Sequence, residues 1–302
     1  MSRHLDDIRG PEGLGPASRL GPVDGGGDRG IGRTADDRLA VAPRRDRVDA
    51  LLERAVADRD RPVVLSTRAE ATVMEIGTFR ALRVDDLARY RYDGDQGAMA
   101  RDLRRLEHMG FVSQHRLSGR RGRPLDVVVL TEAGKRWAEG RPSMEAGDAR
   151  QVLHAGLVKA REVVHEVAIY RMYQAERARL AGEGARVRRV LLDYELKRQV
   201  FSAAGSGASR MPDRCQQQAA AGVQGLRIVD GKVAFPDLRI EYENAGGDLG
   251  RVDLELTTEH YKAGQLRAKA EAGFRIYVAG PPSARMAAVF EERDITVAIL
   301  EL

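Results

Sequence analysis

The sequence predicts an α+β protein in which two folded domains follow a disordered N-terminal tail. Residues 1–45 are rich in glycine and poor in large apolar side chains, so they cannot bury enough surface to offset the entropy cost of ordering. The rest of the 302-residue chain combines helical periodicity with strand-like alternation and is long enough for two cores. We place the first domain at residues 46–141 and the second at residues 148–302.

The composition excludes several classes of protein. A single cysteine, Cys215, rules out an internal disulfide and a cysteine-based zinc site. No window approaches 18 apolar residues, and the first ten residues are too polar for a signal peptide. We therefore expect a cytoplasmic protein with no membrane partner. The pI near 9.5 suits a nucleic-acid partner.

The first domain is expected to contain helices, then a β-hairpin, then a last helix. Apolar residues that recur every three or four positions predict the helices, and alternation predicts the strands. Thr131 is expected to cap the last helix, in which Trp137 packs back on the domain. The expected helices cover residues 47–57, 70–81, 85–92, 95–109 and 131–140, and the expected strands cover residues 111–115 and 125–130.

The most informative of these elements is the helix over residues 95–109. Met99, Leu103 and Leu106 fall on one apolar stripe that would anchor the helix to the domain core. Asp95 is a suitable N-cap, and Gly110 would end the helix.

The outward face of this helix and the tip of the hairpin are strongly basic. Seven arginines stand against three acidic residues between positions 95 and 123, a net charge of +4 out of +5 for the whole chain. Such clustering predicts contact with phosphate groups. The basic side chains are Arg101, Arg104, Arg105 and His108 on the helix and Arg116, Arg120, Arg121 and Arg123 on the hairpin.

Residues 69–137 resemble a winged helix-turn-helix domain. The resemblance rests on the helix DLRRLEHMG, the strand FVSQHR, the tip GRRGRP and the closing LTEAG. It implies that the third helix enters the major groove of double-stranded DNA and that the hairpin touches the flanking backbone or the minor groove. The basic residues of both elements would then be DNA contacts. Two alternatives stay open: a solvated basic surface, or a winged helix that binds another protein.

The second domain is expected to start with a long helix over residues 149–181, whose middle is apolar on nearly every side and contains Glu166. Two alternating segments, 235–243 and 250–258, are expected to pair antiparallel, which brings their acidic faces together. The other expected elements are strands at 186–192, 274–278 and 296–300 and helices at 193–201, 215–221, 260–273 and 283–291.

This order of helices and strands resembles the restriction-endonuclease-like PD-(D/E)xK superfamily. Pro236-Asp237 on one strand and Glu255 on the next carry the resemblance. It implies a nuclease in which Asp237 and Glu255 are catalytic metal ligands for Mg²⁺ and Glu166 is a third carboxylate. The chain departs from the pattern because Thr257 stands where the lysine is expected. The resemblance allows that lysine to be relocated to the following helix, as Lys262 or Lys269.

Other acidic and basic residues bear on whether this domain is active. The sequence Glu195-Leu196-Lys197 also fits the ExK pattern, but it lies on an expected helix, and we interpret it as a surface pair. Residues 223–302 contain ten Lys or Arg against thirteen Asp or Glu, a balance that binds DNA poorly. We therefore predict a nuclease-like domain that is weak or inactive, with DNA binding left to the first domain. DNA binding itself needs no cofactor.

The joint arrangement, including PDLRIEYE and VDLELTTEHYK, is similar to the replication-relaxation family. The resemblance implies a DNA-binding protein of a plasmid or mobile element that acts in replication or mobilisation. Two other functions remain as alternatives: a metal-dependent DNA endonuclease, and a winged-helix transcriptional regulator with a C-terminal oligomerisation or effector domain. The apolar surface of the long helix would allow a homodimer, or it would equally well form the core of the second domain.

Overall fold

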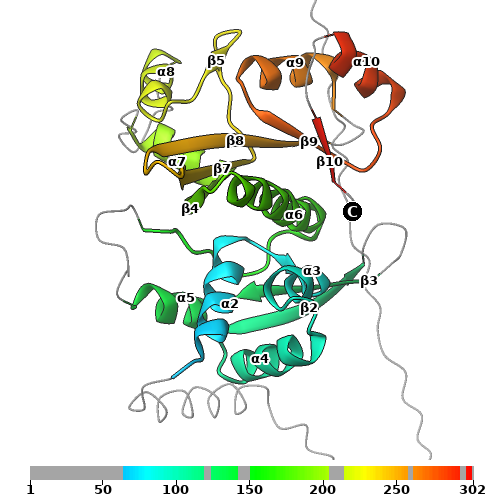
Figure 1. Cartoon of the computed structure of the whole chain (residues 1–302). Helices are drawn as coiled ribbons and strands as arrows, with labels where there is room; N and C mark the ends of the chain where they lie inside the picture. The colour runs from blue at the N-terminus through cyan, green and yellow to red at the C-terminus, as the bar shows by residue number, and fades with distance from the viewer. Residues whose placement is uncertain are drawn as a thin grey trace, which may run out of the picture. The chain divides into compact units, whose positions relative to one another are not determined.

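The structure is a computed structural model that describes residues 64–118, 124–141, 150–203, 214–257, 261–292 and 297–300. Residues Val64–Leu302 belong to one compact unit. Helices and strands alternate through it, which confirms the mixed α+β class (Figure 1). Within the described ranges, no helix is both long and apolar enough to span a membrane. The expected tail at residues 1–45, the helix at 47–57 and the polar segment at 142–147 lie outside the described residues.

The N-terminal half of the unit is a helical layer on a small antiparallel sheet. The sheet has the strand order β1-β3-β2, so the first, short strand pairs with the far strand of the hairpin. Its elements are α2 (Thr67–Thr78), β1 (Leu82–Arg83), α3 (Val84–Arg91), α4 (Gln96–His108), β2 (Val112–Ser118), β3 (Pro124–Leu130) and α5 (Glu132–Glu139).

Side-chain caps define where these helices begin. Asp95 accepts a hydrogen bond of 2.8 Å from the Ala98 backbone N–H, as its position before α4 predicts. Thr131 accepts one of 3.0 Å from the Gly134 N–H at the start of α5. Gly110 follows α4 with a positive φ of 70°, a conformation that a side chain would strain. The predicted bounds of both helices are therefore confirmed to within a residue or two.

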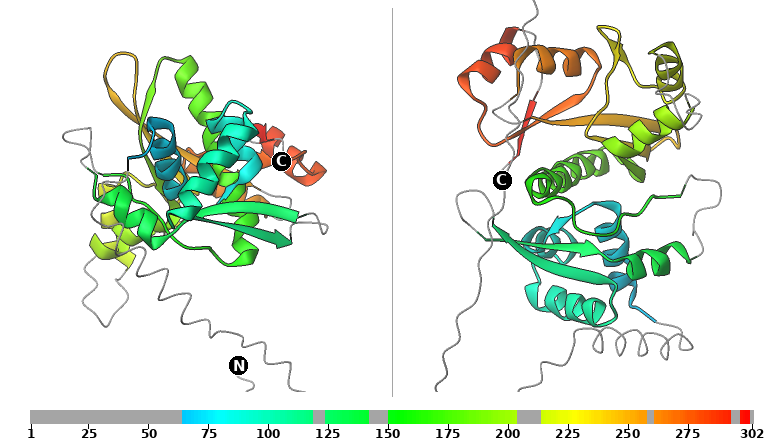
Figure 2. Two further views of the ribbon diagram at one scale, coloured as in Figure 1. Left: turned by 90° about the horizontal axis from the view of Figure 1, so that it is seen from below. Right: turned by 180° about the vertical axis from the view of Figure 1, so that it is seen from behind.

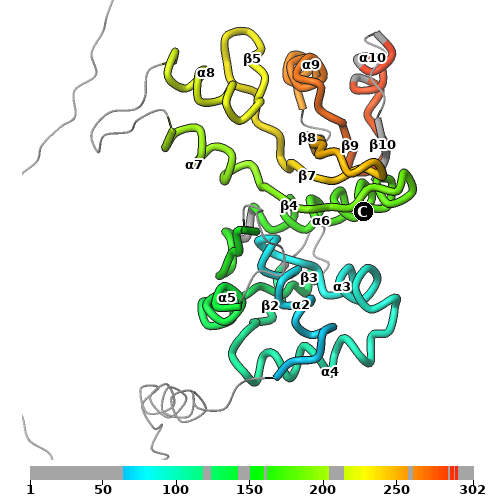
Figure 3. The backbone as a smooth tube through the Cα atoms, turned by 60° about the vertical axis from the view of Figure 1, so that its left-hand side comes forward, coloured from blue at the N-terminus to red at the C-terminus, as the bar shows by residue number. Residues whose placement is uncertain are grey.

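The C-terminal half is a five-stranded mixed sheet between helices. Its strand order is β10-β9-β8-β7-β4, with the β4–β7 and β7–β8 pairs antiparallel and the β8–β9 and β9–β10 pairs parallel. Helix α6 lies on one side of this sheet, while α8, α9 and α10 lie on the other (Figures 1 and 3). The elements are α6 (Ala160–Gly182), β4 (Arg186–Leu192), α7 (Asp193–Ala203), α8 (Arg214–Val223), β5 (Ile228–Val229), β6 (Lys232–Val233), β7 (Leu238–Glu243), β8 (Leu249–Thr257), α9 (Ala263–Glu271), β9 (Arg275–Ala279), α10 (Ala284–Glu292) and β10 (Val297–Leu300).

Helix α6 packs against both halves, which explains why its sequence is apolar nearly all round (Figure 2). Val163 and Val167 join a buried cluster with Val127 and Val129 of β3. Farther along the helix, the carboxylate of Glu176 is fully buried and accepts a hydrogen bond of 2.6 Å from the Tyr277 hydroxyl on β9. Helix α6 thus lies between the two sheets and contacts both.

Two expectations about the second half need correction. The long helix begins at Ala160 and not at residue 149, because residues 150–159 make other backbone contacts. The Gln151 side chain donates to the Val190 carbonyl at 2.9 Å and accepts from the Val190 N–H at 2.9 Å. It thus satisfies backbone groups of β4, which is an edge strand of the sheet. The antiparallel pairing of β7 with β8 is confirmed, but Arg239 faces Asp253 across the strands, so opposite charges meet on the shared face.

Candidate active site

Asp237 and Glu255 lie beside each other on neighbouring strands. Leu238, the first residue of β7, pairs with Leu254 of β8. Asp237 directly precedes Leu238 and Glu255 directly follows Leu254, so the two acidic residues are opposite each other in the antiparallel register. Because side chains alternate along a strand, the two carboxylates are on the same face of the sheet. The Asp237 side chain is 16% exposed, whereas Glu255 is fully buried.

The carboxylate of Glu255 is bound on one side only. Its Oε1 accepts a hydrogen bond of 2.7 Å from the Tyr261 hydroxyl and lies 2.8 Å from Lys269 Nζ. Its Oε2 is buried and has no hydrogen-bond partner. A buried carboxylate oxygen without a partner is costly, and a bound cation would satisfy it.

Lys269 supplies the ammonium group that the strand lacks. It comes from α9, and its Nζ also donates 2.6 Å to the carbonyl of Phe235, just before Asp237. Lys262, the other candidate, lies exposed at the N-cap of α9. Thr257, at the position expected for lysine, is buried and donates to the Tyr277 carbonyl. The geometry therefore brings Lys269 to the carboxylates.

Asp237 contacts a histidine that the sequence analysis did not identify. Asp237 Oδ2 accepts from the Leu256 backbone N–H at 2.9 Å, and its Oδ1 lies 3.5 Å from His165 Nε2 on α6. Burial acts to lower the pKa of His165, but the hydrogen bond and charge of Asp237 raise that pKa overall. No local sequence signal marks His165, because only the fold brings α6 to the start of β7.

Glu166 is near this site but is engaged by an arginine. A concave pocket of about 350 Å³ is lined by residues that include Arg80, His165, Glu166 and Asp237. Within it, Glu166 Oε1 accepts a hydrogen bond of 2.8 Å from Arg80 Nη1. Burial raises the pKa of Glu166, and the charge of Arg80 opposes this rise. Glu166 thus shares the pocket with Asp237 without touching the Asp237–Glu255 pair.

A divalent cation of the Mg²⁺ type fits the donors at this site. Among the described residues, no three His, Cys, Asp or Glu side chains are grouped so as to hold a metal ion. Mg²⁺ needs fewer protein ligands, because it usually binds through one or two carboxylates and keeps several waters. The buried, unpartnered Oε2 of Glu255 beside Asp237 is the observation that matches this requirement.

Burial and, to a lesser extent, the charge of Asp237 raise the pKa of Glu255, and Lys269 and Tyr261 partly oppose them, so that this pKa is about 7. Between pH 4.5 and 7 the folded protein therefore keeps a proton that the unfolded chain has released. Stability falls as the pH rises through this window, because the folded state binds more protons than the unfolded state. A raised carboxyl pKa beside a second carboxylate is common at functional sites.

In metal-free protein, we expect the free energy of unfolding of Glu255→Gln to gain about 3 kcal/mol on that of the wild type between pH 4.5 and pH 8. Urea unfolding at both pH values measures the change. The control is Glu271→Gln, which alters an exposed carboxyl group on α9. A difference between Glu255→Gln and wild type that does not vary with pH would contradict the expectation.

The basic face predicted on α4 is exposed to solvent. On the hairpin, the structure describes Arg116 alone among the predicted basic residues, and this arginine is paired with an aspartate. Arg105 donates to the Val64 carbonyl at 3.1 Å, and Arg116 forms two hydrogen bonds with Asp126, of 2.7 and 3.0 Å. Arg120, Arg121 and Arg123 lie outside the described residues. The exposed basic residues of α4 are Arg101, Arg104, Arg105 and His108.

The prediction that Glu195 and Lys197 form a surface pair is wrong. Glu195 is fully buried, and its Oε1 lies 3.2 Å from His154 Nε2, in the segment that precedes α6. Lys197 pairs instead with Asp193 at 2.6 Å. Helical spacing alone could not show this burial, because α7 follows β4 directly and turns Glu195 back toward the segment before α6.

No protein-family model, curated protein or solved structure matches this chain.

Proposed function

We propose that the protein binds double-stranded DNA through α4 and the β2–β3 hairpin and hydrolyses phosphodiester bonds at Asp237, Glu255 and Lys269. The observation that carries the proposal is the 2.8 Å contact between Lys269 Nζ and Glu255 Oε1. This contact favours an active centre over the weak or inactive domain that Thr257 suggested. The lysine that is missing from β8 is supplied by α9.

Each residue has a role that follows from its contacts. Asp237 Oδ1 and Glu255 Oε2 would hold Mg²⁺, which supplies positive charge next to the scissile phosphate when it is bound. The Leu256 N–H and the Tyr261 hydroxyl fix the other oxygen of each carboxylate. An ammonium group has three N–H donors. Lys269 gives one to Glu255 and one to Phe235, which leaves a third for a phosphate oxygen or the attacking water.

The DNA-binding part of the proposal is supported by charge and element order. The order α2-β1-α3-α4-β2-β3, with β1 paired to β3, is the one expected of a winged helix-turn-helix. Helix α4 would be the groove-reading element, since its basic residues are exposed and its apolar stripe is buried. The resemblance to the replication-relaxation family adds replication or mobilisation of a plasmid or mobile element as the proposed cellular role.

Incubation of the purified full-length chain with supercoiled plasmid and Mg²⁺ tests the nuclease proposal. We expect nicked or linear products, which disappear with a chelator and in Asp237→Asn. The substitution keeps the size of the side chain and its acceptor for the Leu256 N–H, so the fold should survive while cation binding is lost. Cleavage by Asp237→Asn at the wild-type rate, or no cleavage by the wild type, would refute hydrolysis at this site.

A further inference from the structure

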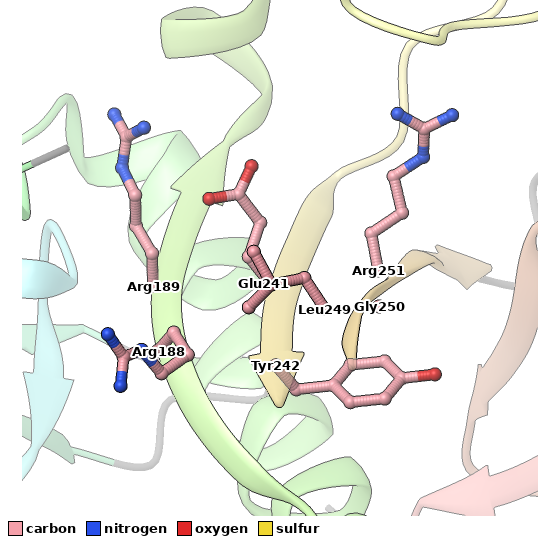
Figure 4. Close-up of a pocket in the computed structure, with 7 residues that line it drawn as sticks. All are labelled: Arg188, Arg189, Glu241, Tyr242, Leu249, Gly250 and Arg251. Carbon is pink, nitrogen blue, oxygen red and sulfur yellow. The ribbon is translucent and has the colours of Figure 1, made fainter. Parts of the chain in front are cut away.

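A second cleft lies at the far end of the sheet from Asp237 and Glu255. It has a volume of about 370 Å³ and opens among β4, β7 and β8 (Figure 4). Three charged residues form one row across these strands, because Arg189 pairs in register with Glu241, and Glu241 with Arg251. In Figure 4 their side chains rise to the same side of the sheet.

This row is on the same sheet face as the candidate active site. Glu241 follows Asp237 by four residues, and Arg251 precedes Glu255 by four, so alternation points all four side chains the same way. Four residues of a strand span about 13 Å. Between this row and the two carboxylates lies the ion pair of Arg239 and Asp253, which is held by hydrogen bonds of 2.6 and 2.8 Å.

The local backbone gives Arg251 a defined position. The Arg251 guanidinium lies against the end of α8, where it donates 3.4 Å to the Gln224 carbonyl and would meet a Cβ on Gly225 at 2.0–2.3 Å. Gly225 also has a positive φ of 60°. On the neighbouring strand position, a Cβ on Gly250 would meet the Tyr242 ring at 2.6–2.8 Å. Two glycines thus make room for an arginine and an aromatic ring at this cleft.

The guanidinium group of Arg189 has a hydrogen-bond donor that is not satisfied. Its Nε is buried and has no hydrogen-bond partner. Burying a guanidinium N–H without an acceptor is unfavourable, so Arg189 would gain from turning its guanidinium toward an anion bound in the cleft. A guanidinium matches the oxygens of a phosphate better than an ammonium does, because its N–H groups form a planar fork.

We propose that the Arg189–Arg251 cleft binds a backbone phosphate of the DNA whose phosphodiester bond is hydrolysed at Asp237, Glu255 and Lys269. This inference rests on the proposed function. The spacing of about 13 Å between the row and the carboxylates places this contact within a few nucleotides of the scissile phosphate on the same strand. Glu241 between the arginines leaves the row with a net charge of +1. Arg189 and Arg251 would give the second half a positive contact with DNA, although residues 223–302 as a whole are net acidic.

Salt-dependent DNA binding tests the inference. The probe is a fluorescent 40-base-pair duplex of mixed sequence, and anisotropy gives the affinity of the full-length chain at several salt concentrations, without Mg²⁺. Arg189→Gln plus Arg251→Gln should weaken binding by about tenfold and reduce the slope of log K against log salt by about 1, since one neutralised phosphate contributes about 0.9. Arg198→Gln plus Arg227→Gln removes the same charge from exposed positions elsewhere in this half and should keep the wild-type slope.

The outcomes separate this inference from the proposed function. If the wild type binds the duplex but the two double variants share one slope, the cleft is not a phosphate site, and the proposed function stands. If the wild type does not bind at all, both fail. Should Arg189→Gln impair folding, the single charge reversal Arg251→Glu at an exposed position gives the same readout and should weaken binding further than Arg251→Gln.

Discussion

Lys269→Met is expected to lower the rate of plasmid cleavage by about 10²–10³-fold, the loss typical of removing one donor from a charge-stabilising site. Methionine keeps the length and apolar stem of lysine but removes the ammonium that lies 2.8 Å from Glu255 Oε1. The carboxylate would then lose its nearest positive charge and hold a proton more strongly, while the phosphate would lose a donor. Initial rates of nicking at saturating Mg²⁺ measure the effect.

Lys262→Met is the matched control, because both lysines belong to the same helix region and were equal candidates from the sequence. Lys262 is exposed at the N-cap of α9, where its backbone and not its ammonium group takes part in the cap. We expect this variant to cleave at close to the wild-type rate. If Lys262→Met lost most of its activity while Lys269→Met cleaved normally, the catalytic lysine would be Lys262, and our assignment of Lys269 would be wrong.

The sequence predicted most accurately those elements whose boundaries depend on local interactions. Helix α4 has an apolar stripe, a capping aspartate before it and a glycine after it, and the structure places it within one residue of the predicted range. Strand β4 was predicted with its observed bounds because three apolar residues follow an arginine-rich start. Each of these signals acts within a few residues, so one sequence is enough to detect it.

The start of α6 was missed because its determinants are distant in sequence. Residues 150–159 have no strong helix breaker before Gly156, yet the backbone of His154 donates to the Gly77 carbonyl at 2.7 Å and that of Gly156 to the Leu130 carbonyl at 2.8 Å. These bonds, together with the pairing of Gln151 to Val190, replace the helical hydrogen bonds. Tertiary contacts of this kind override helix propensity.

The candidate site was predicted in part for a similar reason. Asp237 and Glu255 could be identified because one directly precedes and the other lies on a strand whose alternation is visible in the sequence. The choice between Lys262 and Lys269 depends on how α9 packs over the sheet, and the approach of His165 depends on the path of α6. Neither packing arrangement leaves a local pattern. The sequence therefore predicted the carboxylates and left the lysine open.

Arg101→Ala plus Arg104→Ala is expected to weaken binding of duplex DNA by at least about 30-fold. Both side chains are exposed on the face of α4 opposite its buried stripe, and each contact of an arginine with a base edge or phosphate is worth about 1–3 kcal/mol. Stability should change little, because the buried residues of α4, Leu103 among them, are untouched. Anisotropy with a fluorescent duplex measures affinity, and thermal unfolding checks the fold.

The matched control for this experiment is Arg136→Ala plus Arg198→Ala. These two arginines are exposed on α5 and α7, so the double variant loses the same charge while α4 stays intact. A general electrostatic attraction between a basic protein and DNA would be weakened equally by both double variants, since it depends on net charge. Docking through α4 predicts a large loss for Arg101 and Arg104 alone. Equal losses would mean that α4 is a solvated helix face and that DNA binding by this protein has to be sought on another surface.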